Sequence, residues 1–156
     1  MAKVGASLTR RWMGVGALYA LAVFVIYLAF AESPAFGWQI FLVVFGLAAM
    51  WLADAMRRAT GHTIELTRRE LRYSTGELLA RVENIESVDR GLFAFKPSNG
   101  FLVKVKDKED LRTWYPGMWW RLGRQIGVGG VTLGYQTKFM SEMLSAMIAE
   151  RDGSTK

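Results

Sequence analysis

The chain has 156 residues, a formal net charge of +6, a single histidine and no cysteine. Without cysteine the protein has no disulfide, no thiol nucleophile and no thiolate metal site, and one histidine gives little basis for a histidine-ligated metal. Acidic residues are interleaved with the basic ones, which suits an anionic membrane surface better than nucleic acid. We therefore expect no metal, no cofactor and no nucleic-acid partner.

Two runs of uncharged residues, 13–31 and 35–53, dominate the first third of the chain. As an α-helix rising 1.5 Å per residue, each run would be about 28 Å long, close to the hydrocarbon thickness of a bilayer. Only residues 32–34 separate the two runs. The sequence therefore predicts a transmembrane helical hairpin over residues 13–56, preceded by a basic arm at residues 1–12.

Positively charged residues lie on both outer sides of the two runs, whereas the loop between the runs has none. Such residues are retained on the cytoplasmic side of a membrane. We therefore expect a multi-pass protein with both termini in the cytoplasm and the loop outside. The arginines expected to face the anionic lipid surface are Arg10, Arg11, Arg57, Arg58, Arg68 and Arg69.

A second interpretation of the N-terminus stays open. A basic start, an apolar run and the sequence Ala29-Phe30-Ala31 also fit a signal peptide with a small-residue cleavage site. The apolar run is longer than the roughly 7–15 residues typical of such peptides. If cleavage occurred, the run 35–53 would act as a stop-transfer helix, and the following domain would still face the cytoplasm.

Small residues form a face on each predicted helix, which allows a second helix to approach closely in lipid. These residues are Gly14, Gly16 and Ala17 in the first run and Gly46, Ala49 and Ala53 in the second. They would serve either to pack the two helices on each other or to dock the hairpin into a larger membrane complex.

After residue 58 the apolar pattern becomes alternating, which predicts short strands with one buried face. The predicted strands cover residues 63–67, 70–73, 77–83, 85–89, 101–106, 111–115 and 125–131. Consecutive strands without helices between them imply an antiparallel meander.

The C-terminus changes to helical periodicity over residues 133–150. We expect the apolar stripe of this helix to pack on the sheet, which gives a domain at residues 57–150 and a short tail at residues 151–156. The stripe consists of Phe139, Met140, Met143, Leu144, Met147 and Ile148.

The most unusual segment of this domain places four large aromatic residues and two arginines around a Pro-Gly turn. Trp and Arg are enriched in binding hot spots, and Trp prefers the membrane interface. The segment either contacts a membrane or a protein partner, or its rings plug one end of the sheet domain. Trp119 and Trp120 are expected to be the most exposed of its residues. The candidate interaction residues are Trp114, Tyr115, Trp119, Trp120, Arg121 and Arg124, with Phe93 and Phe95 on the same surface.

The sequence contains no recognisable catalytic motif. The glycines within residues 127–130 lack the Lys-Ser/Thr of a phosphate-binding P-loop and the spacing of a dinucleotide-binding turn. His62 has no evident partner for a metal or a general-base role, and we find no nucleophile with an adjacent base. The sequence therefore predicts a protein without enzymatic activity.

A helical hairpin followed by about seven strands and one amphipathic helix resembles the pleckstrin homology-like (PH-like) fold, and more narrowly the membrane-anchored bacterial PH-like proteins. Segments 64–73 (IELTRRELRY) and 82–89 (VENIESVD) carry the resemblance. It implies an α+β membrane protein, in which a two-helix transmembrane hairpin precedes a PH-like antiparallel β-barrel or sandwich with a C-terminal helix. It does not imply inositol-phosphate recognition, because the connection that holds Arg68, Arg69 and Arg72 is too short and their spacing differs.

The resemblance implies scaffolding or partner binding at the bacterial inner membrane. We therefore expect a non-catalytic PH-like module that the hairpin holds at the lipid bilayer and that mediates contact with a membrane protein or with the membrane surface. The alternative is a small accessory subunit or assembly factor of a respiratory or photosynthetic membrane complex, docked through its helical hairpin.

Overall fold

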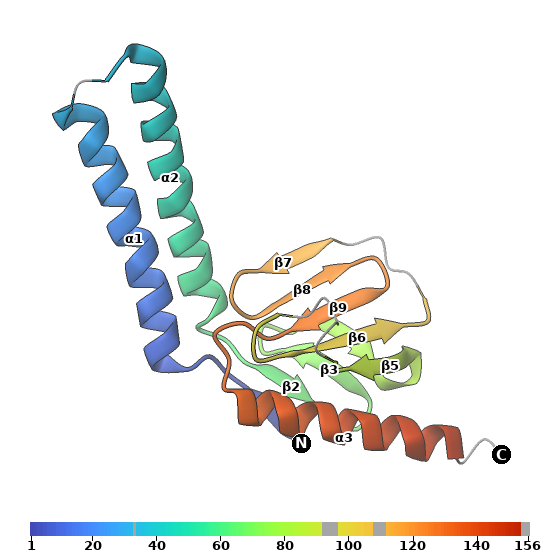
Figure 1. The fold of residues 1–156 in the computed structure, drawn as a ribbon. Coiled ribbons are helices and arrows are strands. Elements are labelled where there is room, and N and C mark those ends of the chain that lie inside the picture. Colours follow the sequence, from blue (N-terminus) through green and yellow to red (C-terminus); the bar gives the residue numbers. More distant parts are fainter. Residues whose placement is uncertain (33, 92–96, 108–111, 154–156) are drawn as a thin grey trace.

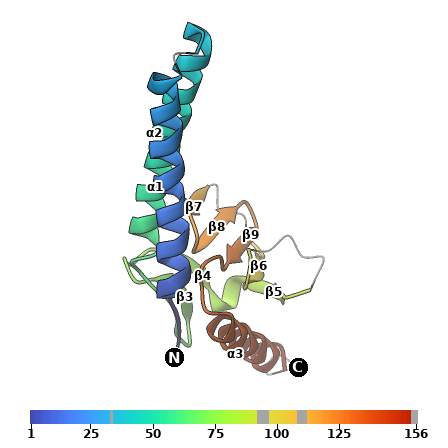
Figure 2. The same cartoon turned by 60° about the vertical axis from the view of Figure 1, so that its left-hand side comes forward.

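The structure, a computed structural model, describes residues 1–32, 34–91, 97–107 and 112–153. Two long helices, two antiparallel sheets and a C-terminal helix give an α+β protein. The two long helices project as a hairpin from one side of the sheet domain, as Figure 1 and the rotated view in Figure 2 show.

The hairpin consists of α1 (Leu8–Ala31) and α2 (Phe36–Ala59), each of 24 residues. Both predicted helices are confirmed, and both extend past the uncharged runs at the end nearest the sheets, which we call the foot of the hairpin. The extension contains arginines, which are good helix formers. Each helix is about 36 Å long at 1.5 Å per residue.

The first sheet has four strands in the order β1-β2-β3-β4. Its strands are β1 (Ala2–Val4), β2 (Ile64–Leu66), β3 (Glu70–Tyr73) and β4 (Leu78–Arg81). Residues 1–12, which the sequence marks as a basic arm, contain β1 and the start of α1. Ala2 and Val4 point into the core, whereas Lys3 points outward and pairs with Glu65 at 2.8 Å.

The helical hairpin is inserted between two strands that pair with each other. β1 precedes α1, β2 follows α2, and the two strands are antiparallel, with Ala2 opposite Leu66 and Val4 opposite Ile64. Both ends of the hairpin are therefore held at the same edge of one sheet. Cleavage after Ala31 would remove a strand of this sheet, so the fold does not fit the signal-peptide interpretation.

A short 3₁₀ helix, η1 (Val82–Asn84), leads into the second sheet, whose strand order is β5-β6-β9-β8-β7. Its strands are β5 (Ile85–Asp89), β6 (Phe101–Val105), β7 (Thr113–Tyr115), β8 (Trp119–Leu122) and β9 (Gln125–Val128). The prediction of a simple meander is wrong, because β9 lies between β6 and β8. The last four strands form a Greek key, and β8 falls in a segment without a strand prediction.

The core lies between the two sheets and α3 (Gly134–Gly153). Met140 and Leu144 of α3 are fully buried, as their spacing predicts. Phe139, assigned to the same stripe, is 56% exposed, so that part of the prediction is wrong. Its position falls on the outer side of the helix because α3 packs mainly along β1 and β5.

Candidate functional site

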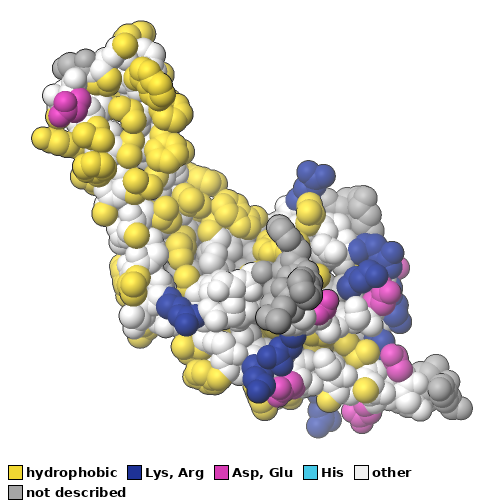
Figure 3. Space-filling view, in the orientation of Figure 1, with side chains coloured by type: hydrophobic (Ala, Val, Ile, Leu, Met, Phe, Trp, Pro, Cys, Tyr) yellow, Lys and Arg dark blue, Asp and Glu magenta, His cyan; other side chains and the backbone are white. Residues whose placement is uncertain are grey.

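The hairpin exposes most of its apolar surface. Both helices are long and apolar enough to cross a membrane, by length and composition, and only 22% and 17% of their most apolar stretches are buried. Large apolar side chains cover its surface in Figure 3. A core helix of a water-soluble protein hides such side chains, whereas a helix surrounded by lipid exposes them.

Small residues hold the two helices together. A Cβ atom at Gly46 would lie 2.5 Å from Cγ1 of Ile26, and one at Gly14 would lie 2.7 Å from Cε of Met56. Ala49 and Ala53 are also buried. Glycine and alanine that let a neighbouring helix approach closely are typical of membrane helix pairs.

Two of the residues assigned to this packing face lie elsewhere. Gly16 and Ala17 are exposed, and a Cβ atom at Gly16 would meet nothing within 4 Å. The prediction that they pack between the two helices is wrong. Val15, Ala22 and Val25 mark the inward face of α1, and a rotation of about 100° per residue turns Gly16 and Ala17 away from Val15.

Charged residues gather at the foot of the hairpin. Asp54 pairs with Arg57 at 2.7 Å and with Arg58 at 2.9 Å. The Arg11 guanidinium donates to the Arg57 carbonyl at 3.1 Å, and the Arg10 guanidinium donates to the Thr132 carbonyl at 3.5 Å. These four arginines therefore surround the level at which the helices meet the sheet domain.

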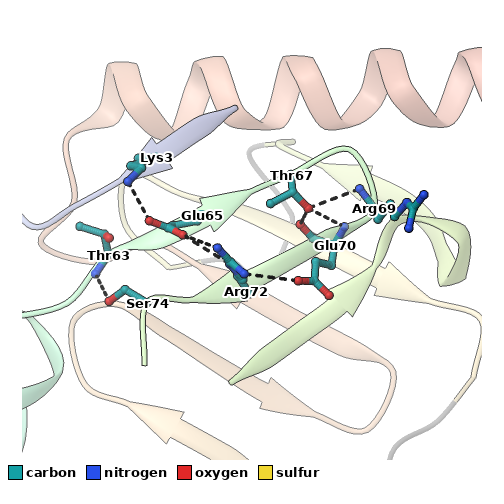
Figure 4. Close-up of polar contacts among 8 residues, drawn as sticks. All are labelled: Lys3, Thr63, Glu65, Thr67, Arg69, Glu70, Arg72 and Ser74. Carbon is teal, nitrogen blue, oxygen red and sulfur yellow. Dashed lines mark hydrogen bonds and ion pairs between the residues drawn. The ribbon is translucent and has the colours of Figure 1, made fainter. Parts of the chain in front are cut away.

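Arg68 and Arg69 lie apart from the other four arginines assigned to the lipid surface. Both belong to the β2–β3 turn, and Figure 4 shows Arg69 at the end of the first sheet opposite Thr63 and Ser74, which lie nearest α2. The structure does not bring these two arginines together with those at the foot of the hairpin.

A row of charges crosses the outer face of the first sheet (Figure 4). Glu65 lies between Lys3 at 2.8 Å and Arg72 at 3.2 Å, and Arg72 also reaches Glu70 at 3.7 Å. Hydrogen bonds from Lys3 and Arg72 lower the pKa of Glu65 below its ordinary value of 4.5. The row ties β1 to its neighbours and leaves this face polar.

The aromatic segment forms the β7–β8 hairpin, whose turn contains Pro116 and Gly117. Gly117 adopts a φ of +80°, a conformation that glycine tolerates without strain. A Cβ atom at Gly117 would lie 3.3 Å from both Met56 and Thr60 of the α2 end. The turn is therefore packed against the foot of the hairpin.

Trp119 is 1% exposed, so the prediction that it is among the most exposed residues is wrong. Its ring stacks on Tyr115 at 5.1 Å and lies edge-on to Tyr73 at 6.1 Å. The three rings fill the end of the core beside α2, which is the plug that the second interpretation of this segment described. The Tyr73 hydroxyl donates to the Ala59 carbonyl and so joins this cluster to the end of α2.

Two tyrosines in this cluster are held in their neutral form. The Tyr115 hydroxyl donates to a Glu77 carboxylate oxygen at 2.6 Å, and this bond and burial raise the pKa of Tyr115 to about 12. Burial raises the pKa of Tyr73 well above its usual value of 10. Both hydroxyls therefore remain hydrogen-bond donors near neutral pH.

Trp114 and Trp120 lie opposite each other on the outer face of the second sheet. Trp114 is 58% exposed, whereas Trp120 is half-buried because its indole covers Gly127 on β9. A side chain at position 127 would collide with that indole, so only glycine fits there. Trp114 is thus the most exposed ring of the aromatic segment.

Both arginines of the aromatic segment form hydrogen bonds with main-chain carbonyls of the sheet domain. Arg121 is 6% exposed and donates to the Leu79 carbonyl on β4, which links the two sheets. Arg124 donates to the Val105 carbonyl at 3.0 Å and pairs with Glu86 at 3.4 Å. Phe93 and Phe95, assigned to the same surface, lie outside the described residues.

An open groove of about 1130 Å³ lies between the C-terminal half of α3 and the ends of β2 and β4. Arginines and glutamates alternate around an apolar floor. Its lining includes Arg68, Arg69, Arg81, Glu70, Glu83, Glu150, Met143 and Met147. Charges of both signs select no single class of ligand for this groove.

His62 is exposed and lies edge-on to the Tyr73 ring at 5.5 Å. Among the described residues, no group of three or more His, Asp and Glu side chains could hold a metal ion. The arrangement around His62 is that of an aromatic contact at the domain surface.

Comparisons with protein-family models, curated proteins and solved structures found no match. The resemblance to PH-like proteins, carried by segments 64–73 and 82–89, stays a prediction.

Proposed function

We propose that this chain is a non-catalytic interaction module of the bacterial inner membrane, whose PH-like sheet domain is held on the cytoplasmic surface by the helical hairpin. The observation that carries the proposal is the insertion of two exposed apolar helices between the paired strands β1 and β2. Both helices of the hairpin connect to the domain, at β1 and at β2. This fixes the distance and the orientation of the domain relative to the membrane, which a single flexible tether does not.

The sidedness follows from the charges at the two ends of the hairpin. Arg10, Arg11, Arg57 and Arg58 lie at the foot, and Glu32 lies at the tip. Because basic residues next to membrane helices are retained in the cytoplasm, the sheet domain is assigned to that side.

Alkaline carbonate extraction tests the anchor. Membranes from cells that express the full chain are washed with alkaline carbonate, and the protein is followed in pellet and supernatant. We expect the protein to stay in the pellet and to be released only by detergent. Release by carbonate would overturn the proposal.

The second candidate function is that of an accessory subunit or assembly factor that docks through its hairpin. It is favoured by the outward position of Gly16 and Ala17, which leave room for a further helix. The substitution Gly16→Leu fits the isolated chain, because nothing lies within 4 Å of its Cβ position.

Copurification in mild detergent separates the two candidates. If the full chain brings down a large membrane complex and Gly16→Leu abolishes this, the second candidate is favoured. If Gly16→Leu leaves every copurifying protein in place, the sheet domain is the interacting part and the first candidate is favoured.

A further inference from the structure

One edge of the sheet domain lies beside the hairpin and not below it. β7 contacts α2, and both views show β7 beside the lower part of α2, above the level at which α2 ends (Figures 1 and 2). The Gly117 turn holds this position through its contacts with Met56 and Thr60. Rotation of the edge away from the helix would break those contacts.

The same edge carries an exposed tryptophan and an exposed arginine. Trp114, in the middle of β7, is 58% exposed, and Arg112, just before β7, is also exposed. Figure 3 shows a basic side chain beside an apolar one at the upper edge of the domain, and apolar side chains where the domain adjoins the hairpin. We call Arg112 and Trp114 the β7 rim.

The hairpin has tryptophans of similar exposure near its foot. Trp12 of α1 is 58% exposed and Trp51 of α2 is 61% exposed. Tryptophan favours the level of the lipid headgroups, where the ring is in an apolar layer and the indole N–H meets water. Arginine binds phosphate through paired, charge-assisted hydrogen bonds.

We propose that the β7 rim is a second membrane contact, in which Trp114 enters the headgroup layer and Arg112 binds the phosphate of anionic lipid. The inference rests on the proposed function, because it needs a hairpin that spans the bilayer. Its partner is the anionic lipid surface, since β7 contacts the apolar helix α2 and Arg112 has the opposite charge to that lipid. With two contacts the domain keeps one face to the membrane and leaves α3 free.

Single cysteines carrying the fluorophore NBD test the proposal directly, because the natural chain has no cysteine. The full chain is reconstituted into vesicles of phosphatidylcholine and phosphatidylglycerol, and fluorescence is quenched with nitroxide-labelled lipid or with aqueous iodide. The test position is Trp114→Cys. The reference positions are Val23→Cys, exposed on α1, and Ala149→Cys, exposed in the last turns of α3.

We expect NBD at 114 to lose fluorescence with nitroxide lipid and to be shielded from iodide, as at 23, and NBD at 149 to behave in the opposite way. If position 23 is quenched by lipid but 114 behaves like 149, the rim proposal fails and the anchor stands. If position 23 is not quenched, the anchor itself fails. Shielding of 114 from iodide without quenching by lipid would indicate a second copy of the chain and would overturn the lipid contact.

Arg112→Gln tests the charge. In the Trp114→Cys background it is expected to reduce lipid quenching in vesicles that contain phosphatidylglycerol, to the level found in phosphatidylcholine alone. If Trp114→Cys with and without Arg112→Gln is quenched equally, in vesicles with and without phosphatidylglycerol, the role of Arg112 is overturned. Because Arg112 and Trp114 are exposed, both substitutions leave the core intact, and circular dichroism checks this.

Discussion

The sheet domain buries its large apolar side chains, whereas the hairpin exposes them. In the domain, Phe101 and Trp119 are at most 1% exposed, and the outer face of the first sheet carries paired charges. In the hairpin, Phe24, Phe30 and Phe41 are at least 54% exposed, and the inner contact includes several glycines and alanines. The domain has the pattern of a protein in water and the hairpin that of a protein in lipid.

The two regions meet at a compact junction. Two paired strands enter and leave the hairpin, the Gly117 turn packs against its foot, and Tyr73 bonds to the last turn of α2. One continuous fold therefore carries both patterns. The following changes separate the contributions of the sheet domain, the hairpin and the junction.

The largest effect is expected for Trp119→Ala in the sheet domain. Removing this buried ring leaves a cavity beside Tyr73 and Tyr115 and lowers the free energy of unfolding by about 3–5 kcal/mol. Urea unfolding in detergent, followed by near-UV circular dichroism, measures the loss. The matched control Trp114→Ala removes an exposed ring and is expected to change stability by less than about 0.5 kcal/mol. Equal effects of the two substitutions would contradict the assignment of Trp119 to the core.

The next effect concerns the contact between the helices. Gly46→Leu inserts a side chain where a Cβ atom would already lie 2.5 Å from Ile26, and it is expected to destabilise helix packing by about 1–3 kcal/mol. Thermal unfolding in detergent, followed by far-UV circular dichroism, measures this. The control Gly16→Leu has open space and is expected to leave the transition in place. A lower transition temperature for Gly16→Leu alone would mean that the helices pack through other faces.

A smaller effect is expected at the junction. Tyr73→Phe removes the donor to the Ala59 carbonyl, which is buried, and is expected to cost about 1 kcal/mol. Hydrogen exchange of the amides in the last turn of α2 is expected to become faster, while exchange in α3 stays as in the natural chain. Unchanged exchange at the end of α2 would show that this bond does not join the two regions.

The smallest effect depends on pH. Because the pKa of Glu65 is lowered in the folded protein, its contribution is complete above its ordinary pKa of 4.5 and is lost as the pH falls through the lower folded-state value. We expect the stability difference between the natural chain and Glu65→Gln to shrink over that acidic range. A difference that stays constant down to the lowest pH at which the chain is folded would contradict the pairing with Lys3 and Arg72.

Local sequence patterns predicted most elements of the fold. The uncharged runs gave both long helices, and alternation gave β2 to β7 and β9. β1 was missed because three residues give too short a pattern and its partner β2 lies about sixty residues further along the chain. Strand order was missed because alternation carries no information on which strands become neighbours.

The aromatic segment shows why side-chain exposure was harder to predict. In β8 the inward positions hold Trp119 and Arg121, and the outward positions hold Trp120 and Leu122, so polarity does not mark the faces. An arginine is buried there because its guanidinium reaches the Leu79 carbonyl across the sheets. Such a contact between distant segments leaves no trace in local periodicity.

Labelling of single cysteines with a membrane-impermeant maleimide in intact cells tests the whole arrangement most directly. Glu32→Cys lies at the tip of the hairpin, and Glu83→Cys lies on the exposed surface of the sheet domain. We expect Glu32→Cys to react in intact cells and Glu83→Cys to react only after the cells are lysed. Reaction of Glu83→Cys in intact cells, or protection of both positions, would contradict a hairpin that crosses the membrane and returns to a cytoplasmic domain.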